Sequence, residues 1–209
     1  MNQAVGLLGS GGQADEVESY LGPDRPVAFR AVSAEYLDGK AANQINLEQP
    51  GEQPDVPVIA AVGAPGLRRE MVGKWPFDNY YTLVDEGALV DAQAKIGEGT
   101  IIAPMAVVTT NAVIGKHVII NIAATISHDA VIGDYVTISP GVNIAGRVTI
   151  GAGAFIGIGA VISNGVSIAA GCVIGAGAVV MEDITEANSV AVGVPAKVIS
   201  RNEDWLHEL

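Results

Sequence analysis

Aromatic residues are scarce in this chain of 209 residues: Phe, Trp and Tyr make up 5% of it, although 49% of its residues are hydrophobic. A core built from large rings is therefore excluded, and the interior has to be filled by small aliphatic side chains. A single cysteine, Cys172, excludes an intrachain disulfide. We expect a soluble protein of the cytoplasm.

Basic residues are also few. The chain has 11 Lys and Arg against 23 Asp and Glu, which gives a formal net charge of −12 and a pI near 4.5. Such a charge argues against nucleic acids and anionic membrane surfaces as partners. No apolar run reaches the ~18 residues of a membrane span. Because no basic region precedes an apolar one at the N-terminus, we expect no secretory signal.

What the chain does have is an aliphatic residue at every sixth position from 84 to 180. All members of the series are Val or Ile: Val84, Val90, Ile96, Ile102, Val108, Ile114, Ile120, Ile126, Ile132, Ile138, Ile144, Ile150, Ile156, Ile162, Ile168, Ile174 and Val180. A small or β-branched residue follows four positions after each of them, such as Ala124, Val136 or Cys172.

A period of six fits neither a helix nor one long strand, whose side-chain periods are about 3.6 and 2 residues. It is typical of a parallel β-helix, in which each hexad supplies one short strand and one turn. With three hexads per coil, equivalent positions of successive coils stack at a spacing of about 4.8 Å, and the β-branched residue points inward. A β-sandwich would require strands repeating every 8–12 residues or so. The spacing alone does not decide the hand of the β-helix.

The first 83 residues have a different pattern, with buried strands predicted at 4–9, 27–32, 57–63 and 80–84 and helices near 14–21 and 67–72. Strands that alternate with helices predict a small α/β domain with a Rossmann-like parallel sheet. We expect 33–56 to be a polar loop. The predicted domains are therefore 1–83, the β-helix at 84–199 and a C-terminal helix or tail at 200–209.

This order of domains resembles the bacterial sugar acetyltransferases of the hexapeptide-repeat family, which include sialic acid O-acetyltransferases and nucleotide-aminosugar N-acetyltransferases of surface-glycan synthesis. The closing Gly193-Val194-Pro195-Ala196-Lys197 also matches the family's G-x-P-A-K signature. The resemblance implies a left-handed β-helix, acetyl-CoA as acetyl donor, no metal, a sugar nucleotide as second substrate, and a homotrimer with active sites between subunits.

His128 and Asp129 are the predicted catalytic residues. An acidic neighbour can orient a histidine and stabilise its protonated form, and a histidine is suited to take the proton from an attacking amine. The family has a His-Glu or His-Asp pair at this point of its repeats. Asn121 resembles a family asparagine that contacts the substrate from the adjacent subunit.

The predicted sugar-nucleotide site lies in the first domain. Gly9, Ser10, Gly11 and Gly12 form a glycine-rich turn between a strand and a helix, which favours phosphate binding. The spacing lacks the third glycine of a dinucleotide fingerprint, so NAD is poorly supported. By resemblance this loop grips the nucleotide, together with Gly63 and Arg68. The chain departs from the family at Gln13, where a histidine is frequent, and at 30–32, where many members have acidic residues.

The predicted acetyl-CoA site lies along the repeats. Gly157-Ile158 and Gly175-Ala176 are three hexads apart and should stack, which leaves room for a ligand against the backbone. The resemblance places the pantetheine arm there and makes Lys197 a candidate contact for its phosphates. Thr137 stands where the family often has a second, cofactor-contacting histidine.

Three alternatives stay open at this stage. The same residues could acetylate a sugar hydroxyl instead of an amine. The β-helix could also be a non-catalytic scaffold, because fold does not imply function. A third histidine, His117, is expected to be a solvated corner residue, although a trimer interface could gather such histidines around zinc.

Overall fold

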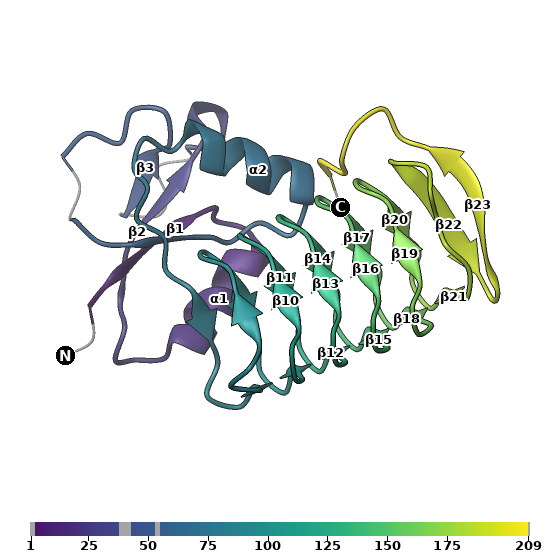
Figure 1. Cartoon of the computed structure of the whole chain (residues 1–209). Helices are drawn as coiled ribbons and strands as arrows, with labels where there is room; N and C mark the ends of the chain where they lie inside the picture. The colour runs from purple at the N-terminus through teal and green to yellow at the C-terminus, as the bar shows by residue number, and fades with distance from the viewer. Residues whose placement is uncertain (1–2, 38–42, 53–54, 209) are drawn as a thin grey trace.

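The structure is a computed structural model that describes residues 3–37, 43–52 and 55–208. It contains a small α/β unit followed by a prism of short stacked strands, a left-handed parallel β-helix (Figure 1). The predicted fold class is thereby confirmed. No helix within the described ranges has the length and apolarity that crossing a membrane requires.

The α/β unit is a parallel sheet of four strands in the order β3-β2-β1-β4. Its elements are β1 (Val5–Leu8), α1 (Gly12–Leu21), β2 (Val27–Val32), the 3-10 helix η1 (Ala34–Tyr36), β3 (Gln44–Asn46), β4 (Val58–Ala60) and α2 (Pro65–Lys74). The prediction of a loop over 33–56 was wrong at η1 and β3, and 38–42 and 53–54 of that range lie outside the described residues. Polar residues of β3 extend the sheet because pairing with β2 uses backbone hydrogen bonds, for which the side chains need not be apolar.

The prism has three faces, each a parallel sheet whose paired strands are three hexads apart in the chain. The first face consists of β5 (Leu83–Val84), β8 (Ile101–Ile102), β11 (Ile119–Ile120), β14 (Thr137–Ile138), β17 (Phe155–Ile156) and β20 (Val173–Ile174), and the hairpin β22 (Ser189–Gly193) and β23 (Ala196–Arg201) extends it. The second consists of β6 (Leu89–Val90), β9 (Val107–Val108), β12 (Thr125–Ile126), β15 (Asn143–Ile144), β18 (Val161–Ile162) and β21 (Val179–Val180). The third consists of β7 (Lys95–Ile96), β10 (Val113–Ile114), β13 (Val131–Ile132), β16 (Thr149–Ile150) and β19 (Ser167–Ile168).

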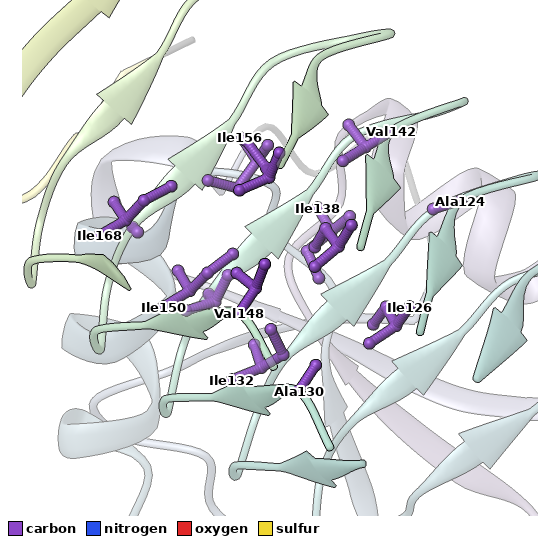
Figure 2. Packing of buried hydrophobic residues seen from close by; sticks show 14 of the residues in the cluster. Ala124, Ile126, Ala130, Ile132, Ile138, Val142, Val148, Ile150, Ile156 and Ile168 are labelled. Carbon is purple, nitrogen blue, oxygen red and sulfur yellow. The ribbon is translucent and has the colours of Figure 1, made fainter. Parts of the chain in front are cut away.

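The six-residue series forms the core of the prism, as predicted. Every member from Ile102 to Val180 is buried in one cluster together with the small residues four positions later. Figure 2 shows these side chains pointing into the interior from all three faces. At the N-terminal end of the prism the series is less protected: Val84 is exposed, and Val90 and Ile96 are half-buried.

Each hexad from Ile96 to Ile174 turns a corner through one residue with a left-handed backbone conformation, three positions after the aliphatic residue of the series. We name each corner by the two faces that it joins in chain order. The left-handed residues are Met105, Ala123, Gly141, Gly159 and Gly177 at the first–second corner, Asn111, Asp129, Arg147 and Gly165 at the second–third corner, and Gly99, His117, Tyr135, Gly153 and Gly171 at the third–first corner. Residues at one corner therefore form columns in which each member is three hexads from the next.

The α/β unit packs on the first face of the prism. Ala14, Val17 and Leu21 of α1 form one apolar cluster with Leu83, Ile101 and Ile119. Helix α2 covers the opposite side of the sheet, where Met71 packs with β1, β2 and β4. The first face thus has a second buried layer, whereas the outer sides of the second and third faces carry exposed residues.

The C-terminal tail returns to the start of α2, as Figure 1 shows. The Leu206 carbonyl accepts a hydrogen bond from the Gly66 amide at 2.8 Å, and Asp204 pairs with Arg69 at 2.9 Å. The Arg69 guanidinium also lies 4.1 Å from the centre of the Trp205 ring. Residues 202–208 form no helix in the structure, so of the two predicted forms, helix or tail, the structure has a tail.

Candidate functional site: a histidine–aspartate pair at a corner of the β-helix

His128 and Asp129 lie side by side at the second–third corner, with their side chains half exposed. Asp129 is the left-handed residue of its hexad (φ 59°), which Asp tolerates better than most residues. His128 Nδ1 lies 2.8 Å from Asp129 Oδ2. In the neutral ring Nδ1 then carries the proton, so Nε2 keeps a lone pair that can accept another.

Asn111, one coil before Asp129 in the same column, holds the second carboxylate oxygen. Its Nδ2 donates to Asp129 Oδ1 at 3.2 Å. The hydrogen bonds from His128 and Asn111, and the charge of Arg147 nearby, hold the pKa of Asp129 below its usual value. The carboxylate is therefore ionised at neutral pH.

Gly146 supports the other side of the imidazole. A Cβ atom at this glycine would lie 2.5 Å from His128 Nε2 and 2.6 Å from Cε1, so the ring occupies the space of a side chain. The equivalent corner positions one coil before His128 and one coil after Gly146 are Thr110 and Asn164. The backbone conformation of the corner therefore does not require glycine. Glycine is required at 146 because the His128 ring occupies the space of a side chain there.

We expect Gly146→Ala to displace the Nε2 end of His128 and to lower kcat about ten- to a hundred-fold, because small errors in the position of a reacting group are costly. Steady-state assays test this, with circular dichroism as a check on folding. Gly73→Ala, at a glycine with nothing within 4 Å of an added Cβ, should leave kcat unchanged. Equal activity of the two variants would contradict the role given to Gly146.

The glycine-rich turn predicted to bind the nucleotide lines a cavity of about 400 Å³. Its lining consists of Gly9, Ser10, Gly11, Gly12, Gln13, Val32, Ser33, Tyr36, Ala61, Val62, Gly63, Leu67 and Met71. Gly11 and Gly12 have open space where a Cβ would stand, at the N-terminus of α1. The buried Nε2 of Gln13 has no hydrogen-bond partner, so it is a donor available to a ligand. None of these lining side chains carries a formal charge.

The predicted acetyl-CoA residues are stacked at the first–second corner, as their spacing requires. Ile158 and Ala176 are exposed, and the left-handed Gly159 and Gly177 beside them have nothing within 4 Å of an added Cβ. The backbone at Gly159 and Gly177 is therefore open on this side, and we call this stretch of the corner the ledge. Lys197 is exposed on β23 and lies 3.6 Å from Glu182, a contact that leaves its ammonium group largely hydrated.

Asn121 occupies the same column as Gly157 and Gly175, but it is buried, and its Nδ2 donates to the Ile138 carbonyl at 3.1 Å. This corner is separated from His128 by the second face. Within one chain, the ledge at Gly159 and Gly177 and the histidine–aspartate pair at His128 therefore lie apart. The residues predicted to act together lie at different corners of the same prism.

Arg68 and Thr137 were predicted as ligand contacts, and the structure places both inside the protein. Arg68 is 1% exposed, and its guanidinium donates to the carbonyls of Val62, Gly63, His117, Tyr135 and Val136 and to Thr137 Oγ1. The Thr137 hydroxyl donates to the Gly63 carbonyl at 2.6 Å. Burial lowers the pKa of Arg68 to about 9, so the side chain remains cationic at neutral pH. Both residues join the α/β unit to the prism.

His117 is 3% exposed, so the prediction of a solvated corner was wrong. Its ring stacks on Tyr135 at 5.1 Å and meets the edge of Tyr80 at 4.5 Å. Burial lowers its pKa to about 4, which leaves the ring neutral. No group of three or more His, Cys, Asp or Glu that could hold a metal occurs in the described part of the chain.

Asn111, Gly146 and Arg147 were not singled out from the sequence. The signal that could have found them is the stacking distance: counting three hexads from Asp129 in either direction leads to Asn111 and Arg147, and counting three hexads onward from His128 leads to Gly146. A coil repeat thus identifies the neighbours of a known site residue.

The sequence pattern of the bacterial transferase hexapeptide family (six repeats) matches residues 111–146 and 147–181. No curated protein is similar enough in sequence to match. Among solved structures, the acetyltransferase domain of PglB from Neisseria gonorrhoeae is 27% identical with a TM-score of 0.82, covering 95% of this chain and 100% of that one. It has also been solved with acetyl coenzyme A (26% identity).

Two further solved structures are similar over nearly the whole chain. PerB from Caulobacter crescentus, in complex with CoA and GDP-perosamine, is 27% identical with a TM-score of 0.80 and coverage of 94% and 97%. WeeI from Acinetobacter baumannii is 26% identical with a TM-score of 0.79 and coverage of 95% and 100%. These similarities confirm the resemblance inferred from the repeats and from the order of the domains.

Proposed function

We propose that this chain, which has the fold and repeats of the hexapeptide sugar acetyltransferases, transfers the acetyl group of acetyl-CoA to the free amine of a nucleotide-linked amino sugar. The observation that carries the proposal is the His128–Asp129 pair at an exposed corner of the β-helix, with Nε2 of the histidine free. Similarity over 94% of the chain to a structure that holds CoA and GDP-perosamine supports the choice of substrates.

In this reaction acetyl-CoA supplies the acetyl group as a thioester. His128 Nε2 accepts the proton that the amine loses as its nitrogen forms the new bond to the acetyl carbon. Asp129 holds the ring in the required tautomer and stabilises the imidazolium that results. The carbon–sulfur bond breaks as the amide forms, and the proton on His128 can pass to the departing thiolate. The histidine is then neutral again.

The sugar nucleotide is assigned to the cavity at the N-terminus of α1. Its glycines allow phosphates to approach backbone N–H groups, and Gln13 offers a free donor. In this proposal residues 1–83 bind the sugar nucleotide, 84–199 bind acetyl-CoA and catalyse the transfer, and 200–209 are a tail. We further propose a cytoplasmic location, in keeping with a chain that has one buried, free cysteine.

We also propose a homotrimer with active sites between neighbouring prisms. The support is the separation of His128 from the ledge around Gly159, since a second copy of the chain can supply the ledge that one copy holds too far away. Sedimentation equilibrium should give three times the 21.4 kDa chain mass. A monomer that is fully active at assay concentration would contradict the shared site.

The function is tested by incubating the protein with acetyl-CoA and UDP-, dTDP- or GDP-linked amino sugars. A ligand present at about 100 times its Kd stabilises the folded state by about 2.7 kcal/mol and should raise Tm by roughly 5–10 °C. We expect such shifts with acetyl-CoA and with one of the sugar nucleotides, followed by release of CoA. Mass spectrometry after alkaline treatment distinguishes the products, because amides survive where esters hydrolyse. An unchanged Tm in the presence of acetyl-CoA would reject the proposed acetyltransferase activity.

A further inference from the structure

Arg147 lies directly beside the catalytic pair. It follows Asp129 by three hexads and therefore occupies the next coil of the same column, where it is the left-handed corner residue (φ 58°). Its backbone N–H donates to the carbonyl of His128 at 2.9 Å. The coil spacing is about 4.8 Å, and the charge of Arg147 acts on the carboxylate of Asp129, which places the guanidinium on the side of the catalytic pair.

This arginine makes no ion pair or side-chain hydrogen bond within the part of the chain that the structure describes, although its charge acts on the nearby carboxylate of Asp129. Among the described residues, Arg147 and Lys95 are the basic side chains without an ion pair, a side-chain hydrogen bond or a ring contact. Arg147 is also the only Lys or Arg between Lys116 and Lys197 in the sequence, in a chain with a net charge of −12. An exposed, unpaired guanidinium at a reaction centre is suited to an anionic group of a substrate.

The cavity assigned to the sugar nucleotide offers backbone N–H groups to the phosphates but no basic side chain. A nucleoside diphosphate carries negative charge on both phosphates, yet none of the side chains that line the cavity is basic. Arg68, the nearest arginine in the sequence, is buried and donates to backbone carbonyls instead. A basic side chain that binds the diphosphate would therefore come from outside the cavity.

The chemistry of the two substrates decides which of them Arg147 meets. In acetyl-CoA the whole uncharged pantetheine arm separates the phosphates from the reacting thioester. In a nucleotide-linked amino sugar the diphosphate is bonded directly to the ring that carries the reacting amine. When that amine faces His128, the nearest anion is therefore the phosphate attached to the sugar.

We propose that Arg147 binds the sugar-proximal phosphate of the acceptor and makes the enzyme specific for nucleotide-linked rather than free amino sugars. This assignment rests on the proposed function. The Arg147 backbone N–H is hydrogen-bonded to the carbonyl of His128, the residue that takes the proton. This bond sets the distance between the arginine and the histidine, and therefore the distance between phosphate and amine that the site accepts. The α/β unit packs on the first face, which does not adjoin the second–third corner, so the cavity that holds the nucleoside end belongs to a neighbouring copy of the chain, and Arg147 holds the sugar end.

The test compares Arg147→Gln with Lys95→Gln, which removes the other unpaired cation of the described residues, on the third face. For Arg147→Gln we expect the KM of the nucleotide amino sugar to rise about ten- to a hundred-fold, the scale of a lost hydrogen bond between charged groups. The KM of acetyl-CoA should change less than two-fold, and Arg147→Lys should recover part of the loss. The Ki of the free nucleoside diphosphate, used as an inhibitor, should rise with the KM of the acceptor. Lys95→Gln should leave all constants unchanged.

An unchanged acceptor KM in Arg147→Gln, or a rise confined to acetyl-CoA, would overturn the assignment. So would a loss of oligomeric state in Arg147→Gln that accounts for the effect, which sedimentation would reveal. Failure of the wild-type protein to acetylate any nucleotide amino sugar would instead reject the proposed function, and this assignment with it. Turnover of free amino sugars at the same KM would show that the diphosphate is not recognised.

Discussion

His128→Ala is expected to lower kcat by about two to four orders of magnitude, the usual contribution of a general base. Binding of acetyl-CoA should persist, because the pantetheine arm is assigned to the ledge around Gly159, and His128 acts on the proton of the amine. Stopped assays of CoA release give kcat, and the thermal shift with acetyl-CoA reports binding separately.

Asn164→Ala is a matched control, since this residue is exposed and stands two coils away from His128 at the same position of its hexad. Its activity should remain near wild type. Asp129→Asn should fall between these variants, because the ring keeps a neighbour but loses the charge that stabilises its protonated form. Near-normal activity of His128→Ala would remove the histidine from the mechanism and favour the scaffold hypothesis.

Arg68→Ala is expected to lower the free energy of unfolding by about 3–5 kcal/mol, in the range measured when one partner of a buried polar network is removed. The substitution leaves a cavity and deprives five carbonyls, from both parts of the chain, of their donor; the hydrogen bonds to His117, Gly63 and Val136 are buried. Chemical denaturation measures the loss, provided that the transition is two-state.

Arg69→Ala, the adjacent and more exposed residue, is the control and should cost about 1 kcal/mol or less, as exposed ion pairs do. Arg68→Lys keeps the charge but has fewer donors in a different geometry, so we expect an intermediate loss. A cost below about 1 kcal/mol for Arg68→Ala would show that water replaces the guanidinium, and that Arg68 does not join the two parts of the protein.

The different outcomes for Arg68 and His128 show what kind of site residue can be predicted from a sequence. Both were identified by resemblance to a family. His128 lies in the repeat, where its position follows from counting hexads, and the structure places it at a corner beside Asp129 as expected. Arg68 lies on α2, and its surroundings depend on how that helix meets residues 117 and 135–137 of the prism. No local pattern contains that information.

The same reasoning explains the error at His117. Its place at the third–first corner follows from the repeat, and most corner side chains are in contact with water. It is buried because Tyr80, Tyr135 and the α/β unit cover this particular corner. The repeat is the same at all three corners, so the sequence does not reveal which one another part of the chain will cover.

By itself the sequence determined the β-helix, its inward-facing series and the stacking of equivalent positions in successive coils. Those features are local, because each hexad needs only an aliphatic residue, a turn and the next coil to pair with. Contacts between segments far apart in the chain are not required. The tertiary structure alone decided the role of Arg68, the burial of His117, the pairing of β3 and the contact of the tail with α2. In each of these, segments distant in the chain meet through backbone hydrogen bonds and ring contacts, for which several sequences serve equally well.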